Sequence, residues 1–537
     1  MTVLPHVQRP RTFLPATRRG PAPVWIMALI VAAAMAIPLV YLIIRAAQAD
    51  ADAWRELTRS STYNLLKNTV LLALAVTATS VALALPMAWL TVRSDIPWRR
   101  FWSVVTVLPL VIPSFVGGLA FIAALGPHGS LQRLLEPLGV ASLPDIFGFT
   151  GAWLTLSLFT YPYLLITLRS GLRGADPAME EASRALGIGP WQTFRRVIVP
   201  QLRVPLAAGS LLVALYVISD FGAVSLLRFD TLTVSIFSKF RTFDRPAAAV
   251  ISLLLVVLVI IVLSAESRSR GRGRYYQSGS ASPRPPRVTH LGRWTWPATA
   301  FLALITMLAL ALPVAVLLDW LIRGLRAGEP FQDTWTAAWH SLSVSAVAGL
   351  VAVIAAIPVA TVAVRHRSIL SGLIERLSYL GFALPGIVVA LSLVFFSLNV
   401  VPGLYQNWNV LIFGYIVLFF PQALGPVRSS FVRVKPSIEE AARSLGRGPG
   451  WVAATITIPL LAPGLIGGFA LVFLTTMKEL PATLLLAPIE FDTLSTQVWG
   501  AADEAFFARA AAPALMLILF SAIPMALILG RDHRLRD

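Results

Sequence analysis

Long apolar runs recur along the whole chain and are separated by shorter stretches that hold most of the charged residues. Each run has about 20 residues, enough for a helix to cross a hydrocarbon core about 30 Å thick. Helices are the expected spanning elements because backbone groups in lipid must find their hydrogen-bond partners within the protein. The pattern predicts twelve spans, at residues 24–47, 67–92, 101–125, 148–168, 204–224, 246–265, 296–322, 340–363, 376–399, 407–427, 461–477 and 509–530.

A polar segment rich in arginine, glycine, serine and proline interrupts this pattern near the middle of the chain. Such a composition is typical of a linker. The predicted organisation is therefore a basic cytoplasmic tail at 1–23, a transmembrane domain at 24–265, a cytoplasmic linker at 266–294, and a second transmembrane domain at 295–537. An even number of spans in each domain inserts both domains in the same orientation, so a repeat between them would be parallel.

The two domains repeat the same sequence features in the same order. Asn68 and Pro86 correspond to His340 and Pro358 at one constant offset, and after a shorter loop Pro200 corresponds to Pro459. Several further ordered matches of this kind indicate an internal duplication. The predicted fold class is an all-α integral membrane protein with two parallel-repeated six-helix halves and about 12 transmembrane helices.

The composition agrees with this class. Charged residues make up 13% of the chain and hydrophobic residues 57%, whereas a soluble domain has about 25% charged residues. The net charge of +18 is concentrated in loops on the side of the N-terminus, which is the positive-inside pattern and predicts cytoplasmic termini. We therefore expect no nucleic-acid partner. The absence of cysteine excludes disulfides and thiolate metal sites, and the N-terminal tail lacks the apolar core of a cleavable signal peptide.

Two loops at equivalent positions carry the best-matched stretches, DPAMEEASRALGIGPWQTFRRVIVP at 176–200 and KPSIEEAARSLGRGPGWVAATITIP at 435–459. Each predicts a short helix, a left-handed glycine stop at Gly187 or Gly446, and a second short helix. Ser437 and Glu440 fit a capping box, and Asp176 fits an N-cap. A single loop of this kind is also compatible with a structural elbow on the lipid surface. Its recurrence in both halves favours two docking sites for a twofold partner.

The spacing of Glu-Ala-Ala, Gly and a final proline resembles the signature loop of ABC importer permeases of the type I, MetI-like class. This sequence departs from the family pattern by Ser183 for the second alanine and by Val or Ile for the leucine before the proline. By that resemblance, each loop is a coupling helix that tilts the attached helices between inward-open and outward-open states. The residues assigned to docking in this way are Glu180, Glu181, Ala182, Ser183, Gly187, Pro200, Glu439, Glu440, Ala441, Ala442, Gly446 and Pro459.

The resemblance also implies the partners. These are two copies of a cytoplasmic ATP-binding subunit, an extracytoplasmic substrate-binding protein, and the lipid of a bacterial inner membrane. The chain itself is not expected to be an enzyme or to bind a cofactor, with ATP and Mg held by the ATP-binding subunits. A phosphate-binding loop needs Gly-Lys followed by Ser or Thr, and none of the four lysines of this chain follows a glycine.

Two stretches bear on the substrate, DFGAVSLLRFDTLTVSIF at 220–237 and KELPATLLLAPIEFDTLSTQVW at 478–499. They resemble the corresponding parts of fused ferric-iron permeases, so ferric iron is the expected substrate. Thiamine, phosphonate, sulfate and polyamine permeases are similar and remain alternatives. Asp220 and Glu479 occupy equivalent positions, where they either line the pathway or serve as a solvated helix end or a structural pair with Lys478 or Arg228.

Other functional classes have less support in the sequence. The six histidines are scattered over loops and termini, so no metal site is predicted. An ion-coupled secondary transporter can also be built from two parallel six-span halves. Such a transporter would have no reason to carry two matching docking loops. The expected function is therefore the membrane permease subunit of an ATP-driven importer.

Overall fold

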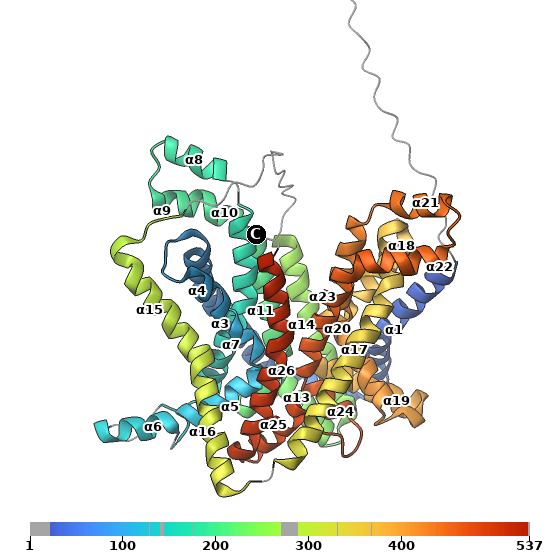
Figure 1. Ribbon diagram of the computed structural model, residues 1–537. Coiled ribbons are helices and arrows are strands. Elements are labelled where there is room, and N and C mark those ends of the chain that lie inside the picture. Colours follow the sequence, from blue (N-terminus) through green and yellow to red (C-terminus); the bar gives the residue numbers. More distant parts are fainter. Residues whose placement is uncertain are drawn as a thin grey trace, which may run out of the picture.

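The computed structural model describes residues 22–127, 129–139, 144–175, 177–269, 288–329, 331–366 and 368–534. The basic tail and most of the linker therefore lie outside the described residues, as does Asp176 with its predicted N-cap. The described chain is almost entirely helical (Figure 1), and ten of its helices are long and apolar enough to cross a membrane. The all-α membrane fold class is confirmed.

Each half contributes a corresponding series of long helices, with shorter ones between them. In the first half these are α1 (Ala22–Ala47), α3 (Ser60–Arg93), α5 (Ser114–Leu125), α7 (Phe149–Arg173), α11 (Arg203–Ser219) and α14 (Arg245–Ser269). In the second half they are α15 (Thr295–Thr306) with α16 (Leu312–Ala327), α17 (Gln332–Arg365), α19 (Gly386–Val400), α20 (Trp408–Arg433), α23 (Ile458–Met477) and α26 (Phe507–Arg534).

The third predicted span of each half, 101–125 and 376–399, is wrong as a single helix. In the first half α4 (Arg99–Val105) is followed by a 3-10 turn, η2 (Leu108–Val111), and only then by α5. The second half repeats this with α18 (Ile369–Ser378), η7 (Leu380–Ala383) and α19. The breaks lie at Pro113 and Pro385, each of which forces the preceding residue into an extended conformation. The predicted span 204–224 also stops early, because α11 ends at Ser219.

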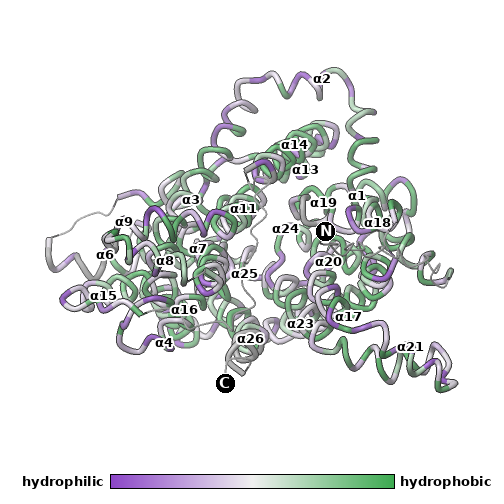
Figure 2. The backbone as a smooth tube through the Cα atoms, turned by 90° about the horizontal axis from the view of Figure 1, so that it is seen from above, coloured by the Kyte–Doolittle hydropathy of each residue, from purple (hydrophilic) through white to green (hydrophobic). Residues whose placement is uncertain are grey.

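The first helix of each half also reaches the other half, in addition to contacts with the last helix of its own half, α14 or α26. Helix α1 lies among α17, α18 and α19 rather than beside α3 and α7 (Figure 2). Its Tyr41 ring meets the edge of Phe396 with centroids 5.6 Å apart. In the same way, Val316 of α16 packs with Ala123 and Ala124 of α5. This reciprocal exchange joins the halves through apolar contacts in addition to the covalent linker.

The described end of the linker is fastened to the first half. The Thr289 amide donates to the Arg93 carbonyl at 2.7 Å, and the Leu291 amide donates to the Asp95 carboxylate at 2.9 Å. His290 Nδ1 lies 2.9 Å from the same carboxylate. The hydrogen bond from the Leu291 amide, and to a smaller extent the one with His290, lower the pKa of Asp95. This attachment therefore weakens only as the pH falls through that lowered pKa.

Candidate docking loops and central cavity

The two signature loops lie at the same end of the molecule (Figure 1), which we call the loop end. The first consists of α8 (Pro177–Ala185), α9 (Pro190–Thr193) and α10 (Val199–Gln201), with a π-helical turn, η4 (Phe194–Ile198), before α10. The second consists of α21 (Pro436–Ser444), α22 (Pro449–Val452) and a matching π-helical turn, η9 (Ala453–Thr457), before α23. The predicted helix, glycine stop and second helix are confirmed in both halves.

The two glycine stops have the predicted left-handed backbone. Gly187 has a φ of 78° and Gly446 a φ of 80°. Each follows a helix whose last turn is closed by a bond from the residue after the glycine, Ile188 to the Ser183 carbonyl and Arg447 to the Ala442 carbonyl. The predicted capping box at Ser437 is wrong, because α21 begins at Pro436, two residues earlier than that cap requires, and its N-cap is Lys435.

Some of the predicted docking residues face inward and hold the loop together. Ser183 is buried and its hydroxyl lies 3.0 Å from that of Thr193, and Ala442 is also buried. Glu181, Ala182, Glu440 and Ala441 are exposed, as is Pro459, whereas Pro200 is half-buried. The predicted set therefore contains both internal and surface positions.

Glu180 and Glu439 connect their loops to the long helices. Arg93, the last residue of α3, pairs with Glu180 at 3.1 Å, and both side chains are nearly buried. Arg365, the last residue of α17, pairs with Glu439 at 3.4 Å. The expected pairs within the first helices are also present, to Arg184 at 2.9 Å and to Arg443 at 3.5 Å. A role for Arg93 or Arg365 was not predicted from the sequence. Their equivalent positions in the repeat could have indicated one.

Large apolar side chains are exposed on both loops at corresponding places. Leu186 is 79% exposed and its counterpart Leu445 is 83% exposed, directly before the two glycines. Exposed apolar residues accompany them on each loop, namely Met179, Trp191, Ile438 and Trp451. Contiguous exposed apolar residues on a surface indicate an interaction site. The charged and small residues of the motif gave no hint of this feature.

A central cavity of about 800 Å³ lies between the two halves. Asp220 and Glu479 both line it, and both carboxylates also cap short helices. Asp220 accepts from the Ala223 amide at 3.0 Å at the start of α12 (Gly222–Leu226). Glu479 accepts from the Ala482 amide at 3.0 Å at the start of α24 (Pro481–Leu486). Neither carboxylate has an ion pair with Lys478 or Arg228 within the described residues, so that predicted alternative is wrong.

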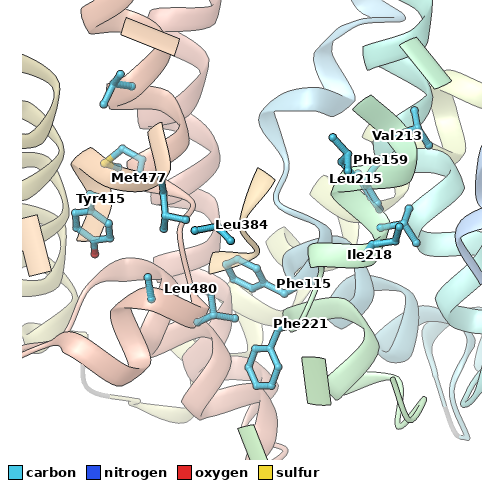
Figure 3. Packing of buried hydrophobic residues seen from close by; sticks show 14 of the residues in the cluster. Phe115, Phe159, Val213, Leu215, Ile218, Phe221, Leu384, Tyr415, Met477 and Leu480 are labelled. Atoms are coloured by element: carbon cyan, nitrogen blue, oxygen red, sulfur yellow. The ribbon is translucent and has the colours of Figure 1, made fainter. Parts of the chain in front are cut away.

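Apolar residues from both halves close the cavity at the side away from the loop end. Phe115, Phe221, Leu384 and Leu480 are buried there and face one another between the halves (Figure 3), and we call this group the apolar closure. Beside it, the Lys478 ammonium of the second half donates to the Leu110 carbonyl of the first half at 2.9 Å. In the part of the chain that the structure describes, no cluster of three or more His, Asp or Glu side chains could hold a metal ion.

A family of binding-protein-dependent transport system inner membrane components matches the chain twice, over residues 80–266 and 348–537. The chain belongs to this family. Its two matched segments confirm the duplication, and each begins after the first helix of its half. Membership makes the chain a multi-pass membrane permease of the ABC transporter class rather than an ion-coupled secondary transporter.

Three relatives show how the likeness is distributed. The Fe(3+)-transport system permease protein FbpB 2 of Haemophilus influenzae is 36% identical over 516 residues, 95% of this chain and 98% of the relative. The probable ABC transporter permease protein y4fN of Sinorhizobium fredii is 25% identical over 89% of each chain. The sulfate transport system permease protein CysT of Escherichia coli is 26% identical, but over 41% of this chain and 80% of its own.

Proposed function

We propose that this chain forms the translocation pathway of an ATP-driven importer for ferric iron. The assignment of ferric iron as the substrate rests on the full-length likeness, at 36% identity, to a permease named for Fe(3+) transport. The sulfate relative matches less than half of the chain and at lower identity. The likeness to the iron permease therefore extends over both domains of this chain, whereas the likeness to the sulfate permease does not.

Two ATP-binding subunits would dock at the loop end, one on each signature loop. The exposed Leu186 and Leu445 would enter an apolar cleft of each subunit, and Glu181 and Glu440 would lie at its polar rim. The ATP and Mg would be bound entirely by these subunits. With the subunits docked there, the loop end and both termini would lie in the cytoplasm of a bacterial cell, which the positive-inside distribution of charge supports.

The substrate would arrive on a binding protein at the opposite face and pass through the central cavity. The apolar closure lies on that side, so this conformation would correspond to an inward-facing state. Asp220 and Glu479 line the cavity while they cap α12 and α24, and we propose that they contribute to the pathway. Closure of the two ATPases would draw the loops together and open the apolar closure.

The test is uptake by proteoliposomes that contain this chain, its ATPase subunits and an iron-loaded binding protein. We expect accumulation of radioactive iron that requires ATP and is unaffected by excess sulfate or molybdate. Replacing Leu186 and Leu445 together by Asp should abolish uptake and co-purification of the ATPase, whereas the same change at exposed Ile369 and Leu370 of α18 should leave both intact. ATP-dependent uptake of sulfate but not of iron would overturn the assigned substrate.

A further inference from the structure

Two equivalent turns at the face opposite the loop end carry side chains of opposite charge (Figure 1). In the first half the turn joins α12 to α13 (Leu232–Arg241), and in the second half it joins α24 to α25 (Leu494–Asp503). In the register of the repeated Phe-Asp-Thr-Leu sequence, Arg228 corresponds to Glu490. Both side chains are exposed, and both residues have a left-handed backbone, with φ values of 52° and 63°.

Each turn is fixed to a long helix of its own half by matching hydrogen bonds. Asn68 of α3 donates to the Asp230 carbonyl at 3.0 Å, and His340 Nδ1 of α17 lies 2.9 Å from the Asp492 carbonyl. In addition, the amide of the first residue of α13 or α25 donates to a hydroxyl of α3 or α17, at 3.1 and 2.8 Å. The two turns are therefore anchored in the same way, and they differ in the charge that they present.

The difference in charge continues to the ends of α13 and α25. Arg241 and Thr242 correspond to Asp503 and Glu504, and all four residues are exposed. Residues 490–504 of the second half include four acidic residues and no basic one. Within the described residues, none of these four carboxylates forms an ion pair, and neither do the two exposed arginines of the first half. The charges are therefore available to a partner.

The positive-inside rule does not explain this difference. With the loop end in the cytoplasm, the rule predicts few arginines at the opposite face of either half. We call Arg228 and Arg241 the basic patch, and Glu490, Asp503 and Glu504 the acidic patch. Because the patches occupy equivalent places in a duplicated fold, their opposite charges distinguish the two halves for a partner that covers both.

The helices that carry the patches meet beside the apolar closure. Phe237 of α13 and Trp499 of α25 are equivalent residues, and their ring centroids lie 5.8 Å apart between the halves. The Trp499 ring also lies 6.0 Å from that of Phe221, a member of the apolar closure. A partner that binds both patches would therefore contact the two helices that pack against the closure.

We propose that the two patches dock the extracytoplasmic binding protein in a single orientation, with an acidic surface of that protein on the basic patch and a basic surface on the acidic patch. This inference rests on the proposed function, which supplies the partner at this face. Turning the binding protein by half a turn would bring like charges together at both patches, and such contacts are repulsive. The same charges would accelerate association at low salt.

The first experiment measures binding to the full-length chain in lipid nanodiscs by surface plasmon resonance. The probe is the binding protein that stimulates ATP hydrolysis by the assembled transporter, whichever substrate it carries. Arg228→Gln with Arg241→Gln, or Glu490→Gln with Asp503→Asn, should lower the affinity several-fold, mainly through slower association. The difference should shrink at high salt, because exposed charges are screened. The control is Arg55→Gln, an arginine outside both patches whose side chain is 74% exposed, and it should bind like the native chain.

Cross-linking from equivalent positions tests the orientation. Phe243→Cys and Ala505→Cys each give this cysteine-free chain one thiol, at exposed positions that correspond in the repeat and lie close to the patches in sequence. A photoactivatable maleimide should mark different peptides of the binding protein, acidic ones from Phe243→Cys and basic ones from Ala505→Cys. Identical peptides from both positions, or equal affinities of the native and charge-changed chains at low salt, overturn the proposal. Failure of the proposed function would appear separately, as absence of ATP-dependent iron uptake by the native chain.

Discussion

At the scale of single residues, the two left-handed glycines are the best example of a feature that is readable from sequence. A glycine placed after a short helix and before a Pro-initiated one predicts a left-handed stop, and both φ values agree. A Cβ at Gly187 or Gly446 would meet no atom within 4 Å. Any cost of substitution there is therefore conformational rather than steric.

Replacing Gly187 and Gly446 together by alanine should destabilise each loop by about 1–2 kcal/mol, the cost of a left-handed L-residue. We expect lower ATP-dependent uptake and weaker co-purification of the ATPase. The control is Gly189→Ala with Gly448→Ala, which lie two residues further on, in equally open space and without a positive φ. Equal uptake by the two double variants would show that the left-handed stop has no role in coupling.

The ion pairs of Glu180 and Glu439 could be predicted only in part. Their bonds to Arg184 and Arg443 follow from helical spacing. The longer bonds to Arg93 and Arg365 join residues far apart in sequence, and no local pattern indicates which arginine a glutamate will meet. The internal repeat narrows the choice, since both arginines and both glutamates occupy equivalent positions.

Arg93→Met should be more harmful than Arg365→Met. Arg93 and Glu180 are 4% and 11% exposed, and Arg93→Met leaves Glu180 with Arg184 alone, so the loss should lie below the cost of an uncompensated buried charge, about 3–5 kcal/mol. The pair of Arg365 is longer and more exposed, so its loss costs less. Thermal unfolding of the purified variants measures the difference. Adding Glu180→Gln should recover part of the loss in Arg93→Met, and a further decrease would contradict the explanation.

At the scale of elements, hydropathy located the long helices but missed the break in the third span of each half. An apolar run looks the same whether it is one helix or two, and the break depends on a single proline. Ile112 and Leu384, which precede Pro113 and Pro385, are extended, as sterics before proline require. The two breaks allow η2 and η7 to line or adjoin the cavity instead of continuing as straight spans.

Helix α12 tests how tightly the apolar closure is packed. A Cβ at Gly222 would lie 2.7 Å from Phe115 Cβ of the same half and 2.9 Å from Leu480 Cδ2 of the second half, so Gly222→Ala should loosen the packing of the apolar closure. The chain has no cysteine, so Ser219→Cys on the cavity wall introduces a single thiol that can be labelled. We expect a maleimide that does not cross the membrane to label this thiol several-fold faster from the side of the closure.

The control for Gly222→Ala is Gly118→Ala in α5. A Cβ there would make only an ordinary contact, 3.6 Å from the Leu227 side chain. Its labelling rate should match that of the parent protein. If Gly222→Ala is labelled no faster than this control, the residues of the apolar closure accommodate the added methyl group without opening a path to the cavity.

At the scale of the whole molecule, sequence predicted two equivalent halves but not how they are joined. Division at the linker assigns α1 to the first half, since hydropathy and chain order contain no information on which bundle a helix contacts. The structure packs α1 on α17, α18 and α19, and α16 on α5. The halves therefore hold each other through exchanged helices, and the linker is not their only connection.

Cutting the chain within residues 270–287 and co-expressing the two fragments should consequently give a complex that survives detergent extraction. Each fragment alone should be unstable, because α1 or α16 would expose the apolar face that the other half covers. Co-purification of the untagged fragment with the tagged one is the measurement. A first fragment that begins at Ala51 lacks α1 but keeps the rest of its half, and it should recover several-fold less of the second fragment. Equal recovery with and without α1 would mean that the remaining contacts between the halves are sufficient, and that the exchanged helix serves another purpose.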